Sequence, residues 1–286
     1  MKRLRYLLII FFFSLAFYIV NSLSPIFFRS NFGTGRRVKD FKITGHRGAA
    51  GISPENSLEA IQKAVELKVA RAEIDVQQTK DNRIIVIHDY SVDRTTNGKG
   101  AVKDLSFSEI RSFFIRDKNQ KITGLKIPTL DEVIDKMDSG TTLLIEIKKE
   151  KALYPGIEQR VVDIINKHKV KQRCIIQSFN DEVLKTVHDI DPGIELHKLM
   201  IAKLPIFNLI FDGSLKCKQL AEYSFIKEFS ISYIFARKPV IDEIHKLNKK
   251  INVWTIDDTT RMKELYDLGV DGIITNYPDR LLKLKL

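Results

Sequence analysis

The chain has 286 residues, of which 44% are hydrophobic and 29% are charged. This composition is typical of a globular chain that buries a core, and it argues against wholesale disorder, a collagen-like repeat and a protein with many membrane spans. The formal net charge of +11 suggests a nucleic-acid or anionic-membrane partner. However, residues 1–45 hold eight basic side chains and one acidic one, so +7 of the total lies there and only +4 remains for the rest. Since that remainder also contains no recognised nucleic-acid-binding motif, we expect no nucleic-acid partner.

The N-terminal segment, residues 1–28, combines a basic start with an apolar run. Three of its first five residues are basic, and from Tyr6 to Val20 only Ser14 interrupts the apolar character. Such a segment is either a secretory signal peptide or a membrane anchor. No well-formed small-x-small cleavage site follows, and residues 6–28 are about long enough to cross a bilayer. We therefore expect a retained single-pass transmembrane helix, with a polar linker over residues 29–41.

Basic residues flank the apolar run on both sides, so the charge rule for membrane proteins leaves both orientations open. We expect a membrane location with the body of the chain on the extracytoplasmic side. Cleavage of the segment would instead release the body by secretion.

Residues 42–286 alternate short β-branched runs with helical patterns. The predicted strands are Lys42–His46, Ala72–Val76, Thr142–Lys148, Arg173–Ser178, Ile194–Met200, Glu228–Ser232, Ile251–Ile256 and Gly272–Thr275. The predicted helices between them include Ser57–Leu67, Leu130–Lys136, Ile157–Lys169, Asp181–Asp189, Val240–Lys249 and Thr260–Leu268. Alternation of this kind predicts parallel strands in an α/β architecture. Eight units in about 245 residues match a (β/α)8 barrel, also called a TIM barrel.

One long stretch, about residues 89–128, interrupts the alternation. A further strand is predicted just before it, at Ile84–His88, and a helical pattern lies within it, at Ser106–Phe114. We therefore predict a small insertion after the second barrel strand.

A second irregular feature is the apolar stretch Leu199–Phe211, which follows the fifth predicted strand. As a loop on the catalytic face it would contact lipid or hold an acyl chain. The more ordinary interpretation, which we favour, is the buried face of the fifth helix or a cap.

Polar residues at the ends of the predicted strands are the candidate functional residues, because the C-terminal ends of the strands form the active face of such barrels. Glu73 and Asp75 lie two apart on the second strand, so their side chains point to the same side. Glu146 lies on the third strand. Three convergent carboxylates repel one another unless a cation joins them, and oxygen ligands suit Mg²⁺ or Ca²⁺.

Two histidines and two cationic residues accompany these carboxylates. His46 ends the first strand and His88 ends the additional strand, and a histidine takes and gives protons near neutral pH. Arg47 and Lys148 supply positive charge for an anionic group. Each residue alone is more typical of a structural or solvated strand end, but together they indicate phosphoryl chemistry.

The same residues lie in a series of motifs that resembles the glycerophosphodiester phosphodiesterase family. The series includes Gly45-His46-Arg47-Gly48, Pro54-Glu55-Asn56-Ser57, Glu73-Ile74-Asp75, His88-Asp89, Arg94-Thr95-Thr96, Glu146-Ile147-Lys148, Val253-Trp254-Thr255 and Thr275-Asn276. The resemblance spans about residues 43–280, and the ordered set is far more specific than any single motif. It implies a barrel with an insertion after the second strand and a divalent metal.

The resemblance also implies a role for each matching residue. The metal ligands would be Glu73, Asp75 and Glu146, the acid–base residues His46 and His88, and the phosphate-binding residues Arg47 and Lys148. Trp254 would form a wall for the glycerol moiety, or else it belongs to the core. We expect hydrolysis of glycerophosphodiesters to glycerol 3-phosphate and an alcohol. The attacking oxygen belongs to the neighbouring glycerol hydroxyl or to water, and we favour His46 as the base and His88 as the acid.

Three other functions stay open at this stage. A membrane-associated lysophospholipase D would use the apolar stretch to hold an acyl chain. A membrane phospholipase C-like enzyme would share the barrel, the metal and the histidines. A non-catalytic barrel that binds phosphate-bearing ligands is disfavoured, because it would be expected to lack one or more of the predicted histidines and carboxylates, and all are present.

Overall fold

The computed structural model describes residues 40–148, 153–204, 209–212 and 219–286. The anchor predicted over residues 1–28 and nearly all of the predicted linker lie outside the described residues. In the described ranges, the chain contains no helix with the length and apolar character that a bilayer crossing requires.

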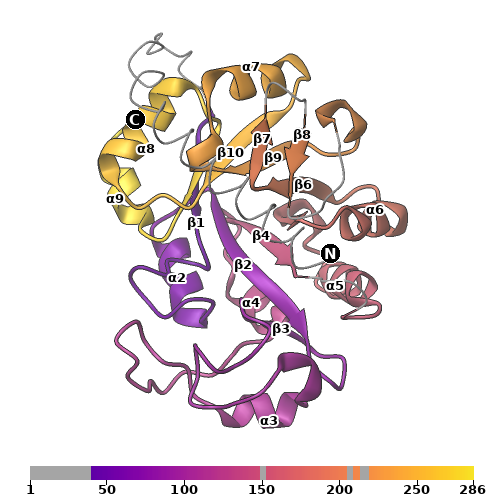
Figure 1. Cartoon of the computed structure of the whole chain (residues 1–286). Helices are drawn as coiled ribbons and strands as arrows, with labels where there is room; N and C mark the ends of the chain where they lie inside the picture. Colours follow the sequence, from indigo (N-terminus) through magenta and orange to yellow (C-terminus); the bar gives the residue numbers. More distant parts are fainter. Residues whose placement is uncertain (1–39, 149–152, 205–208, 213–218) are drawn as a thin grey trace, which may run out of the picture.

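Eight parallel strands form a closed barrel (Figure 1). They are β1 (Lys42–Gly45), β2 (Arg71–Gln78), β4 (Thr142–Ile147), β5 (Cys174–Ser178), β6 (Glu195–Met200), β9 (Glu228–Ser232), β10 (Lys250–Trp254) and β11 (Gly272–Thr275). Neighbours in this order are hydrogen-bonded, and β1 also pairs with β11, which closes the ring. The predicted (β/α)8 barrel is confirmed.

Helices cover the outside of the barrel. They are α2 (Leu58–Glu66), α4 (Leu130–Lys136), α5 (Ile157–Lys167), α6 (Asp181–Ile190), α7 (Lys238–Lys246), α8 (Thr259–Leu268) and α9 (Pro278–Lys283), with one-turn helices η2 (Lys171–Arg173) and η5 (Tyr233–Phe235). Capping residues explain where two of these helices begin. At α2 the Ser57 hydroxyl accepts a hydrogen bond from the amide of Ala60, and at α4 Thr129 and Glu132 form a capping box. Their apolar faces pack on the strands in one large core.

The fifth unit departs from the prediction. After β6 the chain forms an antiparallel pair, β7 (Ala202–Leu204) and β8 (Leu209–Phe211), rather than a helix. In the described residues between β6 and β9, the one helical element is a single turn, η4 (Leu220–Glu222). The prediction that Leu199–Phe211 forms the face of a fifth helix is therefore wrong. Short apolar runs are ambiguous between strand and helix, which explains the error. Ala202 and Ile210 are buried.

The insertion after β2 has a small core of its own. The strand β3 (Ile84–Val86) pairs antiparallel with β2, and residues 89–128 contain η1 (Val102–Asp104) and α3 (Phe107–Ser112). The cluster consists of Ile85, Ile87, Val92, Val102, Ile110, Ile115 and Ile127. Because these side chains pack separately from the main core, the insertion has a fixed shape beside the barrel, at the bottom of Figure 1.

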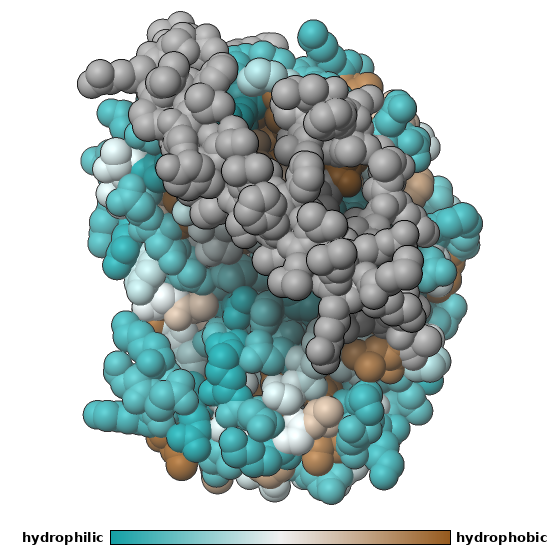
Figure 2. Space-filling view, viewed as in Figure 1, coloured by the Kyte–Doolittle hydropathy of each residue, from teal (hydrophilic) through white to brown (hydrophobic). Residues whose placement is uncertain are grey.

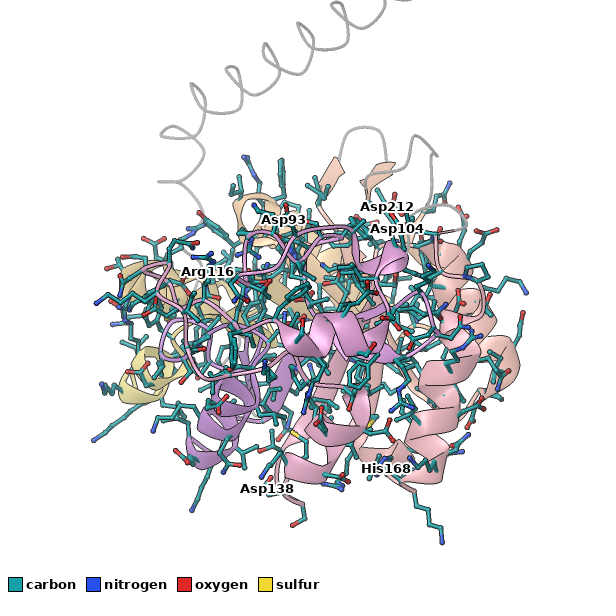
Figure 3. All side chains as sticks on the ribbon, turned by 90° about the horizontal axis from the view of Figure 1, so that it is seen from below. Asp93, Asp104, Arg116, Asp138, His168 and Asp212 are labelled. Carbon is teal, nitrogen blue, oxygen red and sulfur yellow. The ribbon has the colours of Figure 1, made fainter. Side chains whose placement is uncertain are left out.

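The insertion lies at one end of the barrel. In Figure 3, Asp93, Asp104 and Arg116 of the insertion lie at the same end as Asp212, which follows β8. Asp138 and His168, in connections that lead into β4 and β5, lie at the opposite end. The insertion therefore borders the C-terminal ends of the strands.

Candidate active site

Three buried carboxylates lie together near the C-terminal ends of two neighbouring strands. Glu73 and Asp75 share one face of β2, and the parallel register places Glu146 of β4 beside Asp75. The three residues are 1%, 1% and 7% exposed. One oxygen from each can be chosen so that all three lie within 4.8 Å of one another. The sequence spacing and the register together produce this convergence.

The charges of these carboxylates are unevenly stabilised. Burial, together with the negative charges of Asp75 and Glu146, raises the pKa of Glu73 well above its ordinary value. Burial also raises the pKa of Glu146. Burial opposes ionisation of Asp75 as well, but the positive charges of Lys148 and Arg47 hold the pKa of Asp75 below its ordinary range.

This cluster has the chemistry of a cation site. Its donors are all carboxylate oxygens, which suits Mg²⁺ or Ca²⁺, and burial together with the charges of Asp75 and Glu146 raises the pKa of Glu73. Within the ranges that the structure describes, no second cluster of acidic, histidine or cysteine side chains has this geometry. The residues present therefore fit a divalent metal.

Lys148 lies directly beside two of the carboxylates. Its Nζ donates a hydrogen bond to Glu146 Oε1 at 2.6 Å and lies 3.1 Å from Asp75 Oδ1. Although burial opposes the charged form, these carboxylates raise the pKa of Lys148, so the ammonium stays charged. Lys148 is thus a fixed positive charge at the cluster.

Arg47 bridges the cluster and the connection that leads into α2. Its amide donates to Glu73 Oε2 at 2.8 Å, its NH1 donates to Glu55 Oε1 at 2.6 Å, and its Nε lies 3.5 Å from Asp75 Oδ2. Arg47 Nε is buried and has no hydrogen-bond acceptor among the described residues. A guanidinium in this state has a donor to offer an anion.

A chain of hydrogen bonds orients His46. The Asn276 side-chain amide donates to Asp257 Oδ2 at 2.7 Å, and the Asn276 backbone amide donates to Asp257 Oδ1 at 2.9 Å. Because the carboxylate only accepts, the Asn276 oxygen faces His46, where Nδ1 lies 2.7 Å away. Nδ1 therefore carries the proton. Burial, aided by Arg47, lowers the pKa of His46 to about 4, so the ring is neutral at pH 7 with Nε2 unprotonated.

His88 has a different partner. Its Nδ1 lies 2.7 Å from Asp89 Oδ1, and a carboxylate beside an imidazole stabilises the protonated ring. Burial nevertheless lowers the pKa of His88, against the opposing charge of Asp75. Both histidines are partly buried, and the His88 side chain is 34% exposed. The two histidines thus lie in unlike surroundings.

The backbone of the loop that carries His88 is held by Gln77. The amide of Gln77 donates to the carbonyls of Ile87, His88 and Asp89 at 3.2, 2.8 and 2.6 Å. The Tyr154 hydroxyl donates to the Gln77 oxygen at 2.6 Å. The hydrogen bonds of Gln77 thus couple the His88 loop to the buried part of β2.

Trp254 lies at the C-terminal end of β10 and is partly buried. Its ring meets Phe179 edge to face, with centroids 5.7 Å apart, and packs against the small cluster of Leu144, Ile175 and Ile274. Its indole nitrogen is buried and has no hydrogen-bond acceptor in the part of the chain that the structure describes. The Trp254 ring thus packs against apolar side chains, while its indole N–H has no acceptor among the described residues.

A cavity of about 670 Å³ lies between the β1–α2 connection and the insertion. Its lining includes Glu55, Arg94, Arg116 and Lys118. In Figure 2, hydrophilic side chains gather across the middle of the face seen in Figure 1, between the barrel and the insertion.

Several residues of the site had no predicted role. Asp257, Asn276 and Gln77 act through other side chains, and Asn56 donates to Asp75 Oδ2 at 2.8 Å. Asn56 and Asn276 lie inside motifs of the family resemblance, so the sequence marks them as candidate site residues. Their hydrogen-bond partners, however, are 19 and 230 residues away along the chain. Only the fold brings such partners together.

Comparison with known proteins agrees with this geometry. Residues 46–280 match the model of the glycerophosphoryl diester phosphodiesterase family. A glycerophosphodiester phosphodiesterase of Caldanaerobacter subterraneus is 36% identical over 244 residues, covering 85% of this chain and 96% of the relative. A putative glycerophosphodiester phosphodiesterase of Bacillus subtilis is 34% identical over 242 residues, covering 84% of this chain and 96% of the relative.

A solved structure shows the same fold. It is an Oleispira antarctica phosphodiesterase in complex with the product sn-glycerol-3-phosphate, with a TM-score of 0.76 and 24% identity, covering 85% of this chain and 95% of that one. The family match includes every residue of the site and all the barrel strands except β1. The chain therefore belongs to the glycerophosphoryl diester phosphodiesterase family.

Proposed function

We propose that the protein is a phosphoric diester hydrolase that cleaves glycerophosphodiesters to glycerol 3-phosphate and an alcohol. Family membership supports the activity, and the names of the two bacterial relatives support the substrate class. The observation that carries the proposal is the site itself, where two differently oriented histidines lie beside buried carboxylates and two fixed cations.

A divalent cation would be held by Glu73, Asp75 and Glu146. Three carboxylates against Arg47 and Lys148 leave one excess negative charge, and a phosphodiester adds another. A divalent cation balances both, and when bound it supplies Lewis-acid stabilisation of charge on the phosphoryl oxygens. The choice between Mg²⁺ and Ca²⁺ belongs to the experiment below.

The two histidines divide the proton transfers. His46 presents an unprotonated Nε2, and therefore acts as the base that removes a proton from the attacking oxygen. His88, whose protonated form the Asp89 carboxylate stabilises, acts as the acid that protonates the departing alcohol. The attacking oxygen is the neighbouring glycerol hydroxyl, giving a cyclic phosphate, or water.

Arg47 and Lys148 bind the phosphate in this proposal. Lys148 is held charged at the cluster, and the Arg47 guanidinium lies beside it, with Nε 3.5 Å from Asp75 Oδ2. Donors fixed in a partly buried site stabilise developing charge without reorganisation. The unused indole donor of Trp254 lies at the same end of the barrel, where it serves as a wall and a hydrogen-bond donor for the glycerol moiety.

The test is a turnover panel of metal-reconstituted protein with glycerophosphocholine and lysophosphatidylcholine. We expect release of the alcohol from glycerophosphocholine, loss of turnover with a chelator and its return with one of Mg²⁺ or Ca²⁺. Faster turnover of lysophosphatidylcholine would instead assign a lysophospholipase D activity. No turnover by folded, metal-loaded protein would contradict the proposal.

The histidine roles are tested by His46→Ala and His88→Ala. Each variant should lower kcat by about two to four decades, the usual contribution of a general acid or base. Thermal unfolding shows that each variant is folded. Near wild-type turnover in the double variant would exclude this mechanism.

For the N-terminal segment we propose a single-pass anchor with the barrel on the extracytoplasmic side. The basic start and the apolar run of residues 6–28 support this. Extraction of membranes at alkaline pH should leave the full-length chain in the pellet, and external protease should digest the barrel in intact cells. A shortened chain in the medium would show cleavage and secretion instead.

A further inference from the structure

We propose that Arg94 is a positioning residue for the reaction, because it links Arg47, the proposed phosphate-binding residue, to His88, the proposed acid. The inference rests on the proposed function. Arg94 lies in the insertion, and its hydrogen bonds go to Glu55 and Asp89 rather than to the carboxylate cluster or a histidine. It acts through two carboxylates, Glu55 and Asp89.

The contacts of Arg94 are two-pronged on both sides. Its Nε and NH2 donate to Asp89 Oδ2 and Oδ1 at 2.6 and 3.0 Å. Its NH1 and NH2 donate to Glu55 Oε2 and Oε1 at 2.8 and 2.7 Å. Paired, planar contacts of this kind fix direction as well as distance. We call Arg94 with these two carboxylates the Arg94 clamp.

Each carboxylate of the clamp also holds a site residue. Glu55 Oε1 accepts a hydrogen bond from Arg47 NH1 at 2.6 Å, and Asp89 Oδ1 accepts one from His88 Nδ1 at 2.7 Å. A continuous chain thus runs from Arg47 to His88 through the clamp. Since a misplacement of about 1 Å costs up to a hundredfold in rate, holding these two residues at a fixed separation matters for turnover.

The clamp joins segments that are separate in the fold. Arg47 and Glu55 lie between β1 and α2, whereas His88 and Asp89 follow β3 at the edge of the sheet, next to β2. Gln77 fixes the backbone around His88, and its hydrogen bonds go to that loop and to Tyr154 rather than to the β1–α2 connection. The clamp supplies that link through side chains.

Because Arg94 is partly exposed, its positioning role can be distinguished from a role in stabilising the fold. Its side chain is 47% exposed and the carboxylates of Glu55 and Asp89 are 22% and 28% exposed, so water can replace the contacts that are lost with the guanidinium. Loss of Arg94 should therefore disturb the orientation of the site more than the stability of the fold.

Arg111 provides a matched control. It also lies in the insertion, donates to Glu132 Oε2 and Oε1 at 3.0 and 2.6 Å and to the Ile127 carbonyl at 2.9 Å, and is 37% exposed. It thus ties the insertion to the barrel in the same two-pronged way, but touches nothing in the site. Arg111→Gln should leave kcat unchanged.

The experiment compares steady-state kinetics and unfolding midpoints of wild type, Arg94→Gln, Arg94→Lys and Arg111→Gln on glycerophosphocholine. We expect Arg94→Gln to lower kcat about 10- to 100-fold. We expect a smaller change in KM, because Arg47 keeps its contacts with Glu73 and Asp75, and an unfolding midpoint like that of Arg111→Gln. Lysine keeps the positive charge but cannot make the paired hydrogen bonds of a guanidinium, so Arg94→Lys should have a kcat between those of Arg94→Gln and wild type.

A second variant tests the chain itself. Glu55→Gln breaks the clamp from the other side, and the double variant with Arg94→Gln should lose no more kcat than the stronger single variant. Losses that multiply would show that the two residues act independently and would overturn the inference. So would kcat within twofold of wild type in Arg94→Gln, or an equal loss in Arg111→Gln. An inactive wild type would instead count against the proposed function.

Discussion

At the scale of single residues, the histidines differ because their partners differ. Asp257 fixes the orientation of the Asn276 side chain, and Asn276 in turn fixes the proton of His46 on Nδ1. A carboxylate that does not touch the ring therefore decides which ring nitrogen is unprotonated. His88 meets a carboxylate directly. In the proposed mechanism, the neutral amide partner suits His46 to the role of base, and the carboxylate partner suits His88 to the role of acid.

Asp257→Asn tests this orientation. With an amide at position 257, the Asn276 side chain is free to turn its nitrogen toward His46, which places the ring proton on Nε2 and removes the base. We expect kcat to fall about 10- to 100-fold, the usual effect of losing a residue that orients a functional group. The matched control is Asp258→Asn, since the Asp258 side chain caps α8 by accepting a hydrogen bond from the amide of Arg261 rather than from a residue of the site. Equal kcat in Asp257→Asn and wild type would contradict the assignment.

Glu73→Gln tests the crowding of the carboxylates. The raised pKa of Glu73 means that the folded metal-free protein holds a proton that the unfolded chain releases above its ordinary pKa of 4.5. Stability of the metal-free protein therefore declines as pH rises from about 4.5 toward the raised pKa. We expect Glu73→Gln to stabilise the metal-free protein by about 1–2 kcal/mol at pH 8, and by less at pH 5.

Denaturant unfolding with a chelator, at both pH values, measures the effect of Glu73→Gln. Addition of Mg²⁺ or Ca²⁺ should reverse the order, because the wild type gains binding energy that the variant lacks. A variant less stable than the wild type in chelator would show that Glu73 is not under electrostatic strain.

At the scale of elements, the turn between β1 and α2 is the most constrained part of the site. Arg47 and Gly48 both have positive φ, at 50° and 83°, and this turn aims the Arg47 amide at Glu73. A Cβ at Gly48 would lie 2.5 Å from the Ala60 carbonyl carbon and 2.7 Å from the Ile61 nitrogen. The glycine thus lets the turn pack directly on the backbone of α2.

Gly48→Ala should therefore destabilise the fold by about 2–4 kcal/mol, since it adds a backbone clash to an unfavourable φ. The control is Gly269→Ala at the end of α8, which also has positive φ, at 96°, but has nothing within 4 Å of an added Cβ. That variant should lose only about 1 kcal/mol. Equal losses in the two variants, measured by denaturant unfolding, would show that φ alone matters.

At the scale of the whole molecule, a buried ion pair crosses the barrel at the end opposite the site. Arg71 begins β2 and Glu228 begins β9, and the strand order places these strands on opposite sides of the ring. Their side chains meet at 2.7 and 3.2 Å, and His197 and Asn252 also contact Glu228. This cluster ties distant parts of the chain and fills the barrel interior.

Arg71→Met should destabilise the protein by about 3–5 kcal/mol, because it leaves the buried Glu228 charge without its main partner. The double variant Arg71→Met/Glu228→Leu should recover part of that loss, since no charge is then left buried. Unfolding midpoints measure both, and kcat below the transition should stay near the wild-type value. A double variant less stable than Arg71→Met would refute this account.

The sequence by itself determined the barrel and the convergence of the three carboxylates. Strand–helix alternation is a local pattern, and the spacing of Glu73 and Asp75 on one strand fixes their common side. The position of Glu146 then follows from the pairing of consecutive strands. The antiparallel β7 and β8 could not be foreseen, because apolar residues such as those of Leu199–Phe211 suit a strand or a helix equally well.

Only the tertiary structure decided which residues orient the site. The link from His46 to Asn276 spans 230 positions, and the link from Arg94 to Glu55 spans 39. No periodicity encodes such partners, since closure of the barrel and packing of the insertion bring them together. Local sequence thus determines which chemical groups stand at the strand ends, and long-range packing determines their protonation, orientation and separation.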